Sequence, residues 1–580
     1  MGQKTLEQLK NMLKESKELN NFALREYEEA SNYYHSNQLP ADVVAQLKER
    51  GQPPQFENIF AMLMDKILGF KSNSKQDIVV QGQQYEDKDL ALVLTDIIKS
   101  ISSTKKYEQE RRKSELSLCL GIAISRVWCE ILNKKDKLGK NEKIITIDNI
   151  NPLYFFIDPL SVAMDASDAK YFHQIIFIDK EDAENSLKLK DGLQILKNEY
   201  NREIVYFVET WVKNNEKNCV VWDRYIWDNF RIIQYENSPF LNKNHPYVIQ
   251  KLKVDYKNRF YGFFRNLKPI VDSINFTENR ILNMLSSTKV IFENDAVDDA
   301  DKFSEEINLD NAAVSVKSGG LSKIRVEKQS NEIAQISQKQ AEKKNSARII
   351  SGFNDEMLGL ANNRLSGDAM TQRQNAGIVS LANYIEACTD FEKEIFSKVI
   401  SLICHYFDAE QVFRIVDKND FERYFTINEI QKNDNGDFIR DTNGKISIKN
   451  KISVGYYDIR LKNIPKTEGK RDERFKAWAE ILKTILPIMP ELASKILPLV
   501  FEDTDNSAYR DIKEIIQNHE QERAQNQNPS AELQQQRTLL ENQYLEAKIN
   551  TEKAKALNNV GQANYQMNKQ NLMGERTDIQ

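Results

Sequence analysis

The residues that most often perform chemistry in proteins are few in this chain, and they are widely scattered. The five histidines lie far apart in the sequence, at His35, His173, His245, His405 and His519. A zinc-protease helix needs the pattern H-E-x-x-H, but position 523, four residues after His519, is Arg. Isolated histidines are usually structural, so we predict no histidine-based metal site or catalytic triad.

Binding of phosphate groups or of Mg²⁺ also has little support. The chain has neither the G-x-x-x-x-G-K-[ST] loop nor the G-x-G-x-x-G turn whose backbone N–H groups surround phosphates. The acidic run Asp298-Asp299-Ala300-Asp301 offers oxygen ligands that Mg²⁺ could use, but a solvated loop is the simpler interpretation. We therefore predict no catalytic residue, no metal site and no cofactor.

The cysteines do not indicate a disulfide framework. They stand singly, without a C-x-x-C pair, at Cys119, Cys129, Cys219, Cys388 and Cys404. This spacing favours free, buried thiols in a reducing cytoplasm over a disulfide-stapled or zinc-stapled domain.

Composition sets further bounds. With 580 residues, of which 40% are hydrophobic and 29% charged, the chain is expected to form two to four structural regions. The formal net charge of −5 excludes a strongly basic nucleic-acid binder, so any contact with DNA must be local or weak. We expect no secretory or membrane segment, because the most apolar window, Ile481–Phe501, contains charges and three prolines.

The elements that would position functional residues begin with helices. Residues from Lys4 to Tyr34 predict a charged helix, and two prolines break the pattern between Arg50 and Pro54. Apolar residues at helical spacing follow from Ile59 to Ile67, and one long helix is predicted from about Leu90 into Ile124.

The middle of the chain changes to strands. From Val127 to Tyr256, short runs of β-branched and aromatic residues predict an antiparallel domain with one helix near Lys180–Leu189. The predicted strands are Ile144–Ile150, Tyr154–Asp158, Tyr171–Ile178, Val205–Val212, Val220–Trp227 and Arg231–Tyr235.

Two helices with an acidic insert between them come next. An apolar stripe predicts a helix over Leu267–Ser287, with Pro269 near its start, where a missing N–H costs nothing. The acidic run Glu293–Asp310 follows, then a small hairpin of Ala313–Val316 and Ile324–Val326 turning at Gly319-Gly320. A more polar helix is predicted from Glu332 toward Ser351.

The rest of the chain is helical with two hairpins. After the polar break 359–367, a helix is predicted from Asp368 to Phe407, and Asn435-Gly436 and Asn443-Gly444 predict hairpin turns. Proline-broken helices fill 471–517. The Gln-rich tail from His519 has Leu533, Leu540, Ala547 and Ala554 at heptad spacing. It is either a helix that packs in a ring of neighbours or a disordered tail.

Five segments carry a further signal by their order along the chain. They are KERGQPPQFENIFAMLMDKILGF (48–70), KYEQERRKSE (106–115), INPLYFFIDPLSVAMDASDAKYFHQ (150–174), FYGFFRNLKPIVDSINFTENRILNMLSS (260–287) and GLANNRLSGDAMTQRQNAG (359–377). Together, in this order, they resemble the portal proteins of short-tailed, double-stranded-DNA bacteriophages. The region after Lys470 has no segment that matches the family.

The resemblance implies an α+β portal fold with a wing, a two-helix stem, a small α/β clip, a helical crown and a C-terminal helical tail. The expected parts are an N-terminal wing at 1–263, a first stem helix at 264–290, the clip at 291–330, a second stem helix at 331–358, a tunnel loop at 359–367, a long wing helix with β hairpins at 368–470, a crown at 471–518 and a tail at 519–580.

The same resemblance implies a function without catalysis. The chain would form a cyclic homo-oligomer, with twelve copies as usual in the family, at one capsid vertex. The ring would be the conduit for genome packaging and ejection. Its implied partners are the major capsid and scaffolding proteins, terminase, tail or adaptor proteins, and double-stranded DNA held by non-specific contact, with no membrane. The implied location is the virion, with the host cytoplasm during assembly.

Two sets of site residues follow from this expectation. The DNA-facing candidates are Asn362, Asn363 and Arg364 in the tunnel-loop region, although an ordinary helix–helix turn has the same polar composition. The candidates for docking partners on the clip are Glu293, Asp295, Asp298, Asp299, Asp301, Glu305 and Glu306, although a disordered acidic loop is the alternative.

Other functions remain open. A structural or scaffolding phage protein without a DNA channel would also use long helices. A packaging-associated nuclease would need a metal or phosphate site that the sequence does not offer.

Overall fold

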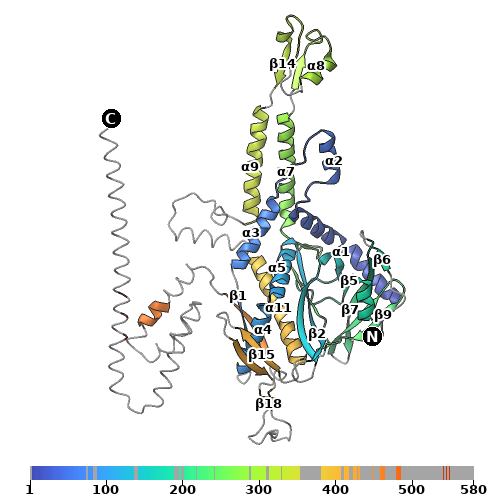
Figure 1. The fold of residues 1–580 in the computed structure, drawn as a ribbon, viewed down its shortest axis with the longest axis vertical. Helices are drawn as coiled ribbons and strands as arrows, with labels where there is room; N and C mark the ends of the chain where they lie inside the picture. Colours follow the sequence, from blue (N-terminus) through green and yellow to red (C-terminus); the bar gives the residue numbers. More distant parts are fainter. Residues whose placement is uncertain are drawn as a thin grey trace. The chain divides into compact units, whose positions relative to one another are not determined.

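In the computed structural model, the chain forms two compact units, Met1–Ile464 and Pro465–Gln580. The structure describes residues 3–73, 76–82, 88–135, 141–187, 195–197, 201–216, 219–240, 242–286, 289–307, 313–327, 330–352, 381–406, 411–416, 422–427, 429–430, 448–449, 457–463, 478–484, 540, 544 and 548. In the second unit, the described residues are helical. The first unit is a mixed α+β fold whose described sheets are antiparallel (Figure 1).

The largest sheet lies in the predicted strand region. Its strand order is β4-β5-β7-β8-β9, with β6 beside β7, and every pairing is antiparallel. The strands are β4 Phe155–Ile157, β5 Tyr171–Asp179, β6 Ile195–Lys197, β7 Glu203–Glu216, β8 Cys219–Trp227 and β9 Ile232–Asn237. Helix α6 (Lys180–Leu187) follows β5, and the short helix η2 (Pro152–Tyr154) precedes β4. The predicted antiparallel strands and the helix near Lys180 are therefore confirmed.

Helix α1 (Leu6–Tyr34) covers part of this sheet. Leu9 and Leu13 pack with Val208 and Trp227 in one buried cluster, because residues four apart lie on the same helix face. Thr5 caps the helix: its side chain accepts the N–H of Gln8 at 3.3 Å, and the Gln8 side chain accepts the N–H of Thr5 at 3.1 Å. The charged N-terminal helix is thus confirmed.

The single long helix predicted from Leu90 into Ile124 is wrong. Two helices, α4 (Lys88–Ser102) and α5 (Lys105–Leu120), occupy this stretch, and a strand begins at Ile122. Thr104 starts α5 by accepting the N–H of Tyr107, and Gly121 ends it at φ +146°, a conformation that side chains disfavour. The apolar residues after Gly121 therefore continue as a strand and not as helix.

That strand belongs to a second antiparallel sheet in the order β10-β2-β3. Its members are β2 Ile122–Lys135, β3 Asn141–Asn149 and β10 Tyr247–Lys251. The sheet shares a large buried cluster with α3 (Ile59–Asn73), α4, α5 and α11 (Ala382–Tyr406). The N-terminal part of the predicted helix over 368–407 lies outside the described residues, and its C-terminal part is confirmed by α11.

Small antiparallel pairs complete this part of the fold. They are β1 Gln76–Gly82 with β19 Tyr457–Asn463, β11 Lys253–Val254 with β12 Phe260–Tyr261, β15 Gln411–Val416 with β16 Glu422–Ile427, and β17 Glu429–Ile430 with β18 Ile448–Lys449. The Asn-Gly pairs at 435–436 and 443–444 lie outside the described residues. None of the described helices is both long enough and apolar enough to cross a membrane.

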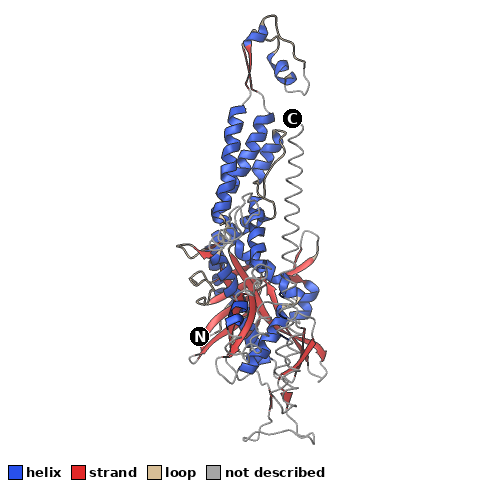
Figure 2. Cartoon of the chain, turned by 90° about the vertical axis from the view of Figure 1, so that its left-hand side faces the viewer, coloured by secondary structure: helices blue, strands red, loops and turns tan. Residues whose placement is uncertain are grey.

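Two long helices lie side by side, as Figures 1 and 2 both show: α7 (Phe264–Ser286) and α9 (Ser330–Ile350). Both predicted helices are confirmed. Pro269, however, is the sixth residue of α7, so its missing N–H removes the helical bond to the carbonyl of Arg265. The interpretation that this proline costs nothing is wrong, because the helix starts earlier than its apolar stripe.

A small module of residues 289–327 joins α7 to α9 (Figure 2). It contains β13 (Lys289–Phe292), α8 (Ala300–Glu306), the short helix η3 (Gly320–Lys323) and β14 (Ile324–Glu327). Its own buried core is Ala296, Val297 and Phe303. The predicted hairpin is wrong: β14 pairs with β13, whereas 313–316 is not a strand, and Gly319-Gly320 instead leads into η3.

Candidate assembly and DNA-contact surfaces

Helices α1 and α7 are joined by three polar pairs at a constant offset. Glu26 pairs with Arg265, Glu29 with Lys268, and Tyr33 with Asp272, each pair 239 positions apart. The pairs advance in the same direction along both helices, so the two helices run parallel where they meet. Arg265 Nη2 lies 2.6 Å from Glu26 Oε2, and Lys268 Nζ lies 2.5 Å from Glu29 Oε1.

This contact raises the pKa of two of its donors, Tyr33 and Lys268. Burial and the hydrogen bond to Asp272 raise the pKa of Tyr33 to about 12, so its hydroxyl remains a donor. Burial alone lowers the pKa of Lys268, but the bond to Glu29 and the charge of Asp272 outweigh burial and raise it. Tyr33 and Lys268 therefore stay protonated, and act as donors, throughout the neutral range.

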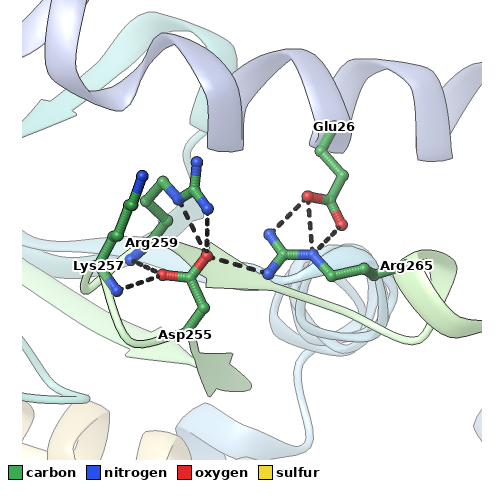
Figure 3. A network of polar contacts seen from close by, with 5 residues as sticks. All are labelled: Glu26, Asp255, Lys257, Arg259 and Arg265. Carbon is green, nitrogen blue, oxygen red and sulfur yellow. Dashed lines mark hydrogen bonds and ion pairs between the residues drawn. The ribbon is translucent and has the colours of Figure 1, made fainter.

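Asp255 connects the base of α7 to the hairpin β11–β12, as Figure 3 shows. Its carboxylate accepts the backbone N–H groups of Lys257 (2.8 Å) and Arg259 (3.1 Å). It also accepts Arg259 Nε (2.9 Å) and Arg265 Nη1 (3.1 Å). Burial on its own raises the pKa of Asp255, but these hydrogen bonds outweigh it and hold the pKa well below its usual range. Arg265 therefore joins two elements to α7: it binds Asp255 of the hairpin and Glu26 of α1.

We call the helix pair α7 and α9 the stalk, and α9 also makes polar contacts that hold it in place. Lys344 Nζ lies 2.6 Å from Glu57 Oε1, just before α3, and Gln340 Nε2 donates to Glu278 Oε2 of α7 at 2.7 Å. Of the 21 residues of α9, only Gln340 and Ala347 are buried. Most of the surface of α9 is therefore not covered by its own chain in the described structure.

The acidic candidates lie in the 289–327 module, and lysines neutralise several of them. Lys323 pairs with Asp295 and lies 3.5 Å from Glu293, Lys317 lies 3.3 Å from Asp298, and Lys302 lies 3.8 Å from Glu306. The bond to Lys323 lowers the pKa of Asp295. The cluster is therefore less acidic than the sequence alone suggests.

The acidic segment is also folded. Asp299 caps α8 by accepting the N–H groups of Asp301 (3.0 Å) and Lys302 (3.2 Å), and Phe303 of the same helix is buried. The alternative of an unstructured acidic loop is therefore wrong for residues 293–307. Asp301 and Glu305 lie on the exposed surface of α8.

The DNA-facing candidates Asn362, Asn363 and Arg364 lie outside the described residues, between Gly352 and Leu381. Their assignment stays a prediction, as does that of the heptad-spaced tail.

The described histidines and cysteines resemble structural residues. His173 is buried between strands, its Nδ1 lies 2.7 Å from Thr210 Oγ1, and burial lowers its pKa to about 3. Cys119, Cys129 and Cys388 are buried and free, as predicted, and Cys404 is partly buried. Among the described residues, no group of three or more His, Cys, Asp or Glu side chains could hold a metal ion.

Sequence reasoning missed the contacts that seat the stalk. The pairing of α1 with α7 joins residues far apart in the chain, and single charged residues give no signal of such a partner. A signal of a contact does exist on α7, where the spacing of four puts three amides on one helix face: Asn275, Asn279 and Asn283. Asn275 Oδ1 accepts the N–H of Glu57, and Asn279 Oδ1 accepts the N–H of Gln55.

Comparison with known proteins identifies the family over nearly the full length of the chain. The sequence profile of the family described as Phage P22-like portal protein matches residues 10–559. The chain is also similar to the portal protein of Helicobacter pylori bacteriophage KHP30. The two are 36% identical over 541 residues, which cover 92% of this chain and 86% of the relative. The chain therefore belongs to the Phage P22-like portal protein family.

Proposed function

We propose that copies of this chain close into a ring at one capsid vertex and that the genome enters and leaves through its bore. The observation that carries this proposal is the family match over residues 10–559, which includes the stalk and the module at its end. Membership of the family implies an oligomeric ring in the capsid, and portal proteins are structural parts of the virion and not enzymes.

The stalk supports a ring on physical grounds. A helix as polar and exposed as α9 gains little from its own chain, since only two of its residues are buried. In a closed ring each subunit covers surfaces of the next, so neighbouring copies would bury what a single copy leaves open. We take the number of copies to be twelve.

We assign the parts of the fold accordingly. The wing comprises 1–263 and 368–470, α7 and α9 are the stem helices, 291–330 is the clip, 471–518 the crown and 519–580 a helical tail. In this assignment the capsid and scaffolding proteins contact the ring during assembly in the host cytoplasm. Terminase docks for packaging, and tail or adaptor proteins dock afterwards.

The clip is the proposed docking surface. Its candidates are Glu293, Asp295, Asp298, Asp299, Asp301, Glu305 and Glu306. Because Lys323, Lys317 and Lys302 already pair with several of them, partners would meet a mixed charged surface in place of a purely acidic one. Asp298, whose side chain is 88% exposed, is the most accessible of the paired carboxylates.

Contact with DNA is proposed to be sparse. Each phosphate that Lys or Arg neutralises adds salt-dependent affinity, so a strongly basic bore would hold DNA in place. A chain with a net charge of −5 would allow the duplex to slide, with Asn362, Asn363 and Arg364 touching phosphates without reading bases.

The test is the charge reversal Arg364→Glu, compared with Arg364→Lys, which keeps the charge. We expect Arg364→Glu to form normal rings but to reduce the nuclease-protected DNA in particles, whereas Arg364→Lys packages normally. Normal packaging by Arg364→Glu would remove the residue from the DNA-contact set. Loss of rings in that variant would assign the residue to assembly.

A further inference from the structure

Residues 38–58 form a connection between α1 and α3 whose two ends are in contact. Gln38 follows α1, Asn58 precedes α3, and Gln38 Nε2 donates to Asn58 Oδ1 at 2.7 Å. Both side chains also hold the end of α1: Gln38 Nε2 donates to the carbonyl of Tyr33 (3.1 Å) and Asn58 Nδ2 to that of Tyr34 (3.1 Å). We call Gln38, Glu57, Asn58 and Asn275 the neck, and residues 39–56 the strap.

Two of the four neck residues are buried, Gln38 at 3% and Asn275 at 2% exposed, whereas Glu57 and Asn58 are partly exposed. Each side-chain nitrogen and oxygen of the three neck amides makes at least one hydrogen bond. Asn275 Nδ2 donates to Gln38 Oε1 (2.8 Å), and Asn275 Oδ1 accepts the N–H of Glu57 (3.1 Å). Asn58 Oδ1 also accepts the N–H of Ala61 (2.9 Å) in the first turn of α3. Opening the neck would leave several polar groups buried without partners, so it is costly.

The strap is held in a different way. Asn279 bonds the backbone of Gln55 twice, through Nδ2 to the carbonyl (2.7 Å) and through Oδ1 to the N–H (3.0 Å). Asn283 Nδ2 donates to Gln52 Oε1 at 3.4 Å. These groups are neutral, and Gln55 and Asn283 are at least partly exposed, so water can replace each bond at little cost.

Little apolar surface fixes the strap. Its helix α2 (Ala41–Glu49) buries only Leu47. The end of the strap is stiff at Pro53 and Pro54, whose φ is fixed, and Gly51, at φ +68°, makes the turn between α2 and these prolines. Helix α2 and the two prolines are therefore stiff pieces on weak contacts, and the two ends of the strap are already joined at the neck.

We propose that residues 39–56 form a hinged strap, which lifts from the Asn279 and Asn283 face of α7 while the buried amide neck stays closed. Lifting uncovers that face of α7 without disturbing the seat of the stalk. The strap and the base of α7 therefore open independently. The neck at the base of α7 depends on hydrogen-bonded amides that are mostly buried, whereas the strap depends on amides that are more exposed.

Hydrogen exchange of the intact, full-length assembly tests this directly. In the unmodified protein, amides of 41–49 should exchange at least about tenfold faster than those of α3 and of α7 up to Asn279, because local opening precedes neck opening. Equal protection of the strap and of these neighbours would overturn the proposal.

Variants on α7 separate the two parts. Asn279→Ala should raise the exchange rate of 41–56 by about tenfold, since it removes two hydrogen bonds, and leave 57–73 unchanged. Asn275→Ala should raise exchange in both stretches. The matched control is Asn266→Ala, an exposed asparagine of α7, which should change neither. If Asn279→Ala alters 57–73 as much as the strap, or leaves the strap unchanged, the hinge does not exist.

Discussion

At the residue scale, Arg265 is the side chain on which the base of the stalk depends most. It reaches Glu26 of α1 through two nitrogens and Asp255 of the hairpin through a third. Guanidinium–carboxylate pairs of this kind are directional, so they fix an angle between helices as well as a distance.

We expect Arg265→Ala to lower the free energy of unfolding by about 2 kcal/mol, the order found for hydrogen bonds to charged groups that are partly buried. The neighbouring exposed Arg25→Ala, which removes the same charge from α1, should change it by less than about 0.5 kcal/mol. Denaturant unfolding of the dissociated subunit measures both. Equal effects of the two substitutions would mean that the Arg265 pairs contribute nothing specific.

Asp255 predicts a pH dependence. Its folded-state pKa lies below its usual 3.8, so its contribution to stability is present at neutral pH and is lost as the pH falls below about 4. Asp255→Asn should therefore destabilise the protein at pH 7 and do so progressively less toward pH 3. Unfolding curves at both pH values check this; a constant difference would show that the carboxylate charge is unimportant there.

At the scale of elements, the 289–327 module depends on the close packing of Gly320 against the backbone of Ala296. Gly320 lies so near Ala296 that an added Cβ would be 2.5 Å from the carbonyl oxygen of Ala296, a backbone atom that cannot easily move. The core of this module is small, so it has little capacity to absorb such a clash.

We expect Gly320→Ala to destabilise the module by about 2 kcal/mol, as overpacking does, and to leave the rest of the chain folded. Ser318→Ala, an exposed site two positions before Gly320, is the control. Limited proteolysis should cut within 289–327 sooner in Gly320→Ala only. Unchanged cutting in that variant would contradict the close packing of Gly320 on Ala296.

The elements show what sequence reasoning could and could not reach. Helix α1 and the strands of the large sheet were predictable, because apolar spacing and the Thr5 cap are local signals. The partner of β14 was not predictable, since Gly319-Gly320 has the composition of a hairpin turn. The true partner, β13, lies 32 to 38 positions before the residues of β14 with which it pairs. The break at Thr104 was missed because a Ser-Ser-Thr run also occurs inside helices.

Only part of the candidate site could be predicted from the sequence, because the sequence shows local patterns and not distant partners. The acidic run identified the module between α7 and α9, but not the lysines that neutralise it, because Lys317 and Lys323 lie beyond the run. The pairing of α1 with α7 could not be selected from 81 basic and 86 acidic residues, since only the fold brings the three matched positions together.

At the scale of the whole molecule, the proposed function requires that copies of the chain associate. The chain belongs to a portal family, and its stalk helix α9 leaves most of its surface uncovered by its own chain in the described structure. Exposed apolar side chains such as Phe276 of α7, Ile349 of α9 and Leu321 of the 289–327 module add to this surface. Neighbouring copies in a ring would bury such surfaces, whereas an isolated subunit would expose them.

The most direct measurement is electron microscopy of the purified full-length chain, with views down the particle axis. We predict closed rings with a central opening and one uniform number of copies. Solitary molecules at every concentration, or open filaments that never close, would contradict this prediction.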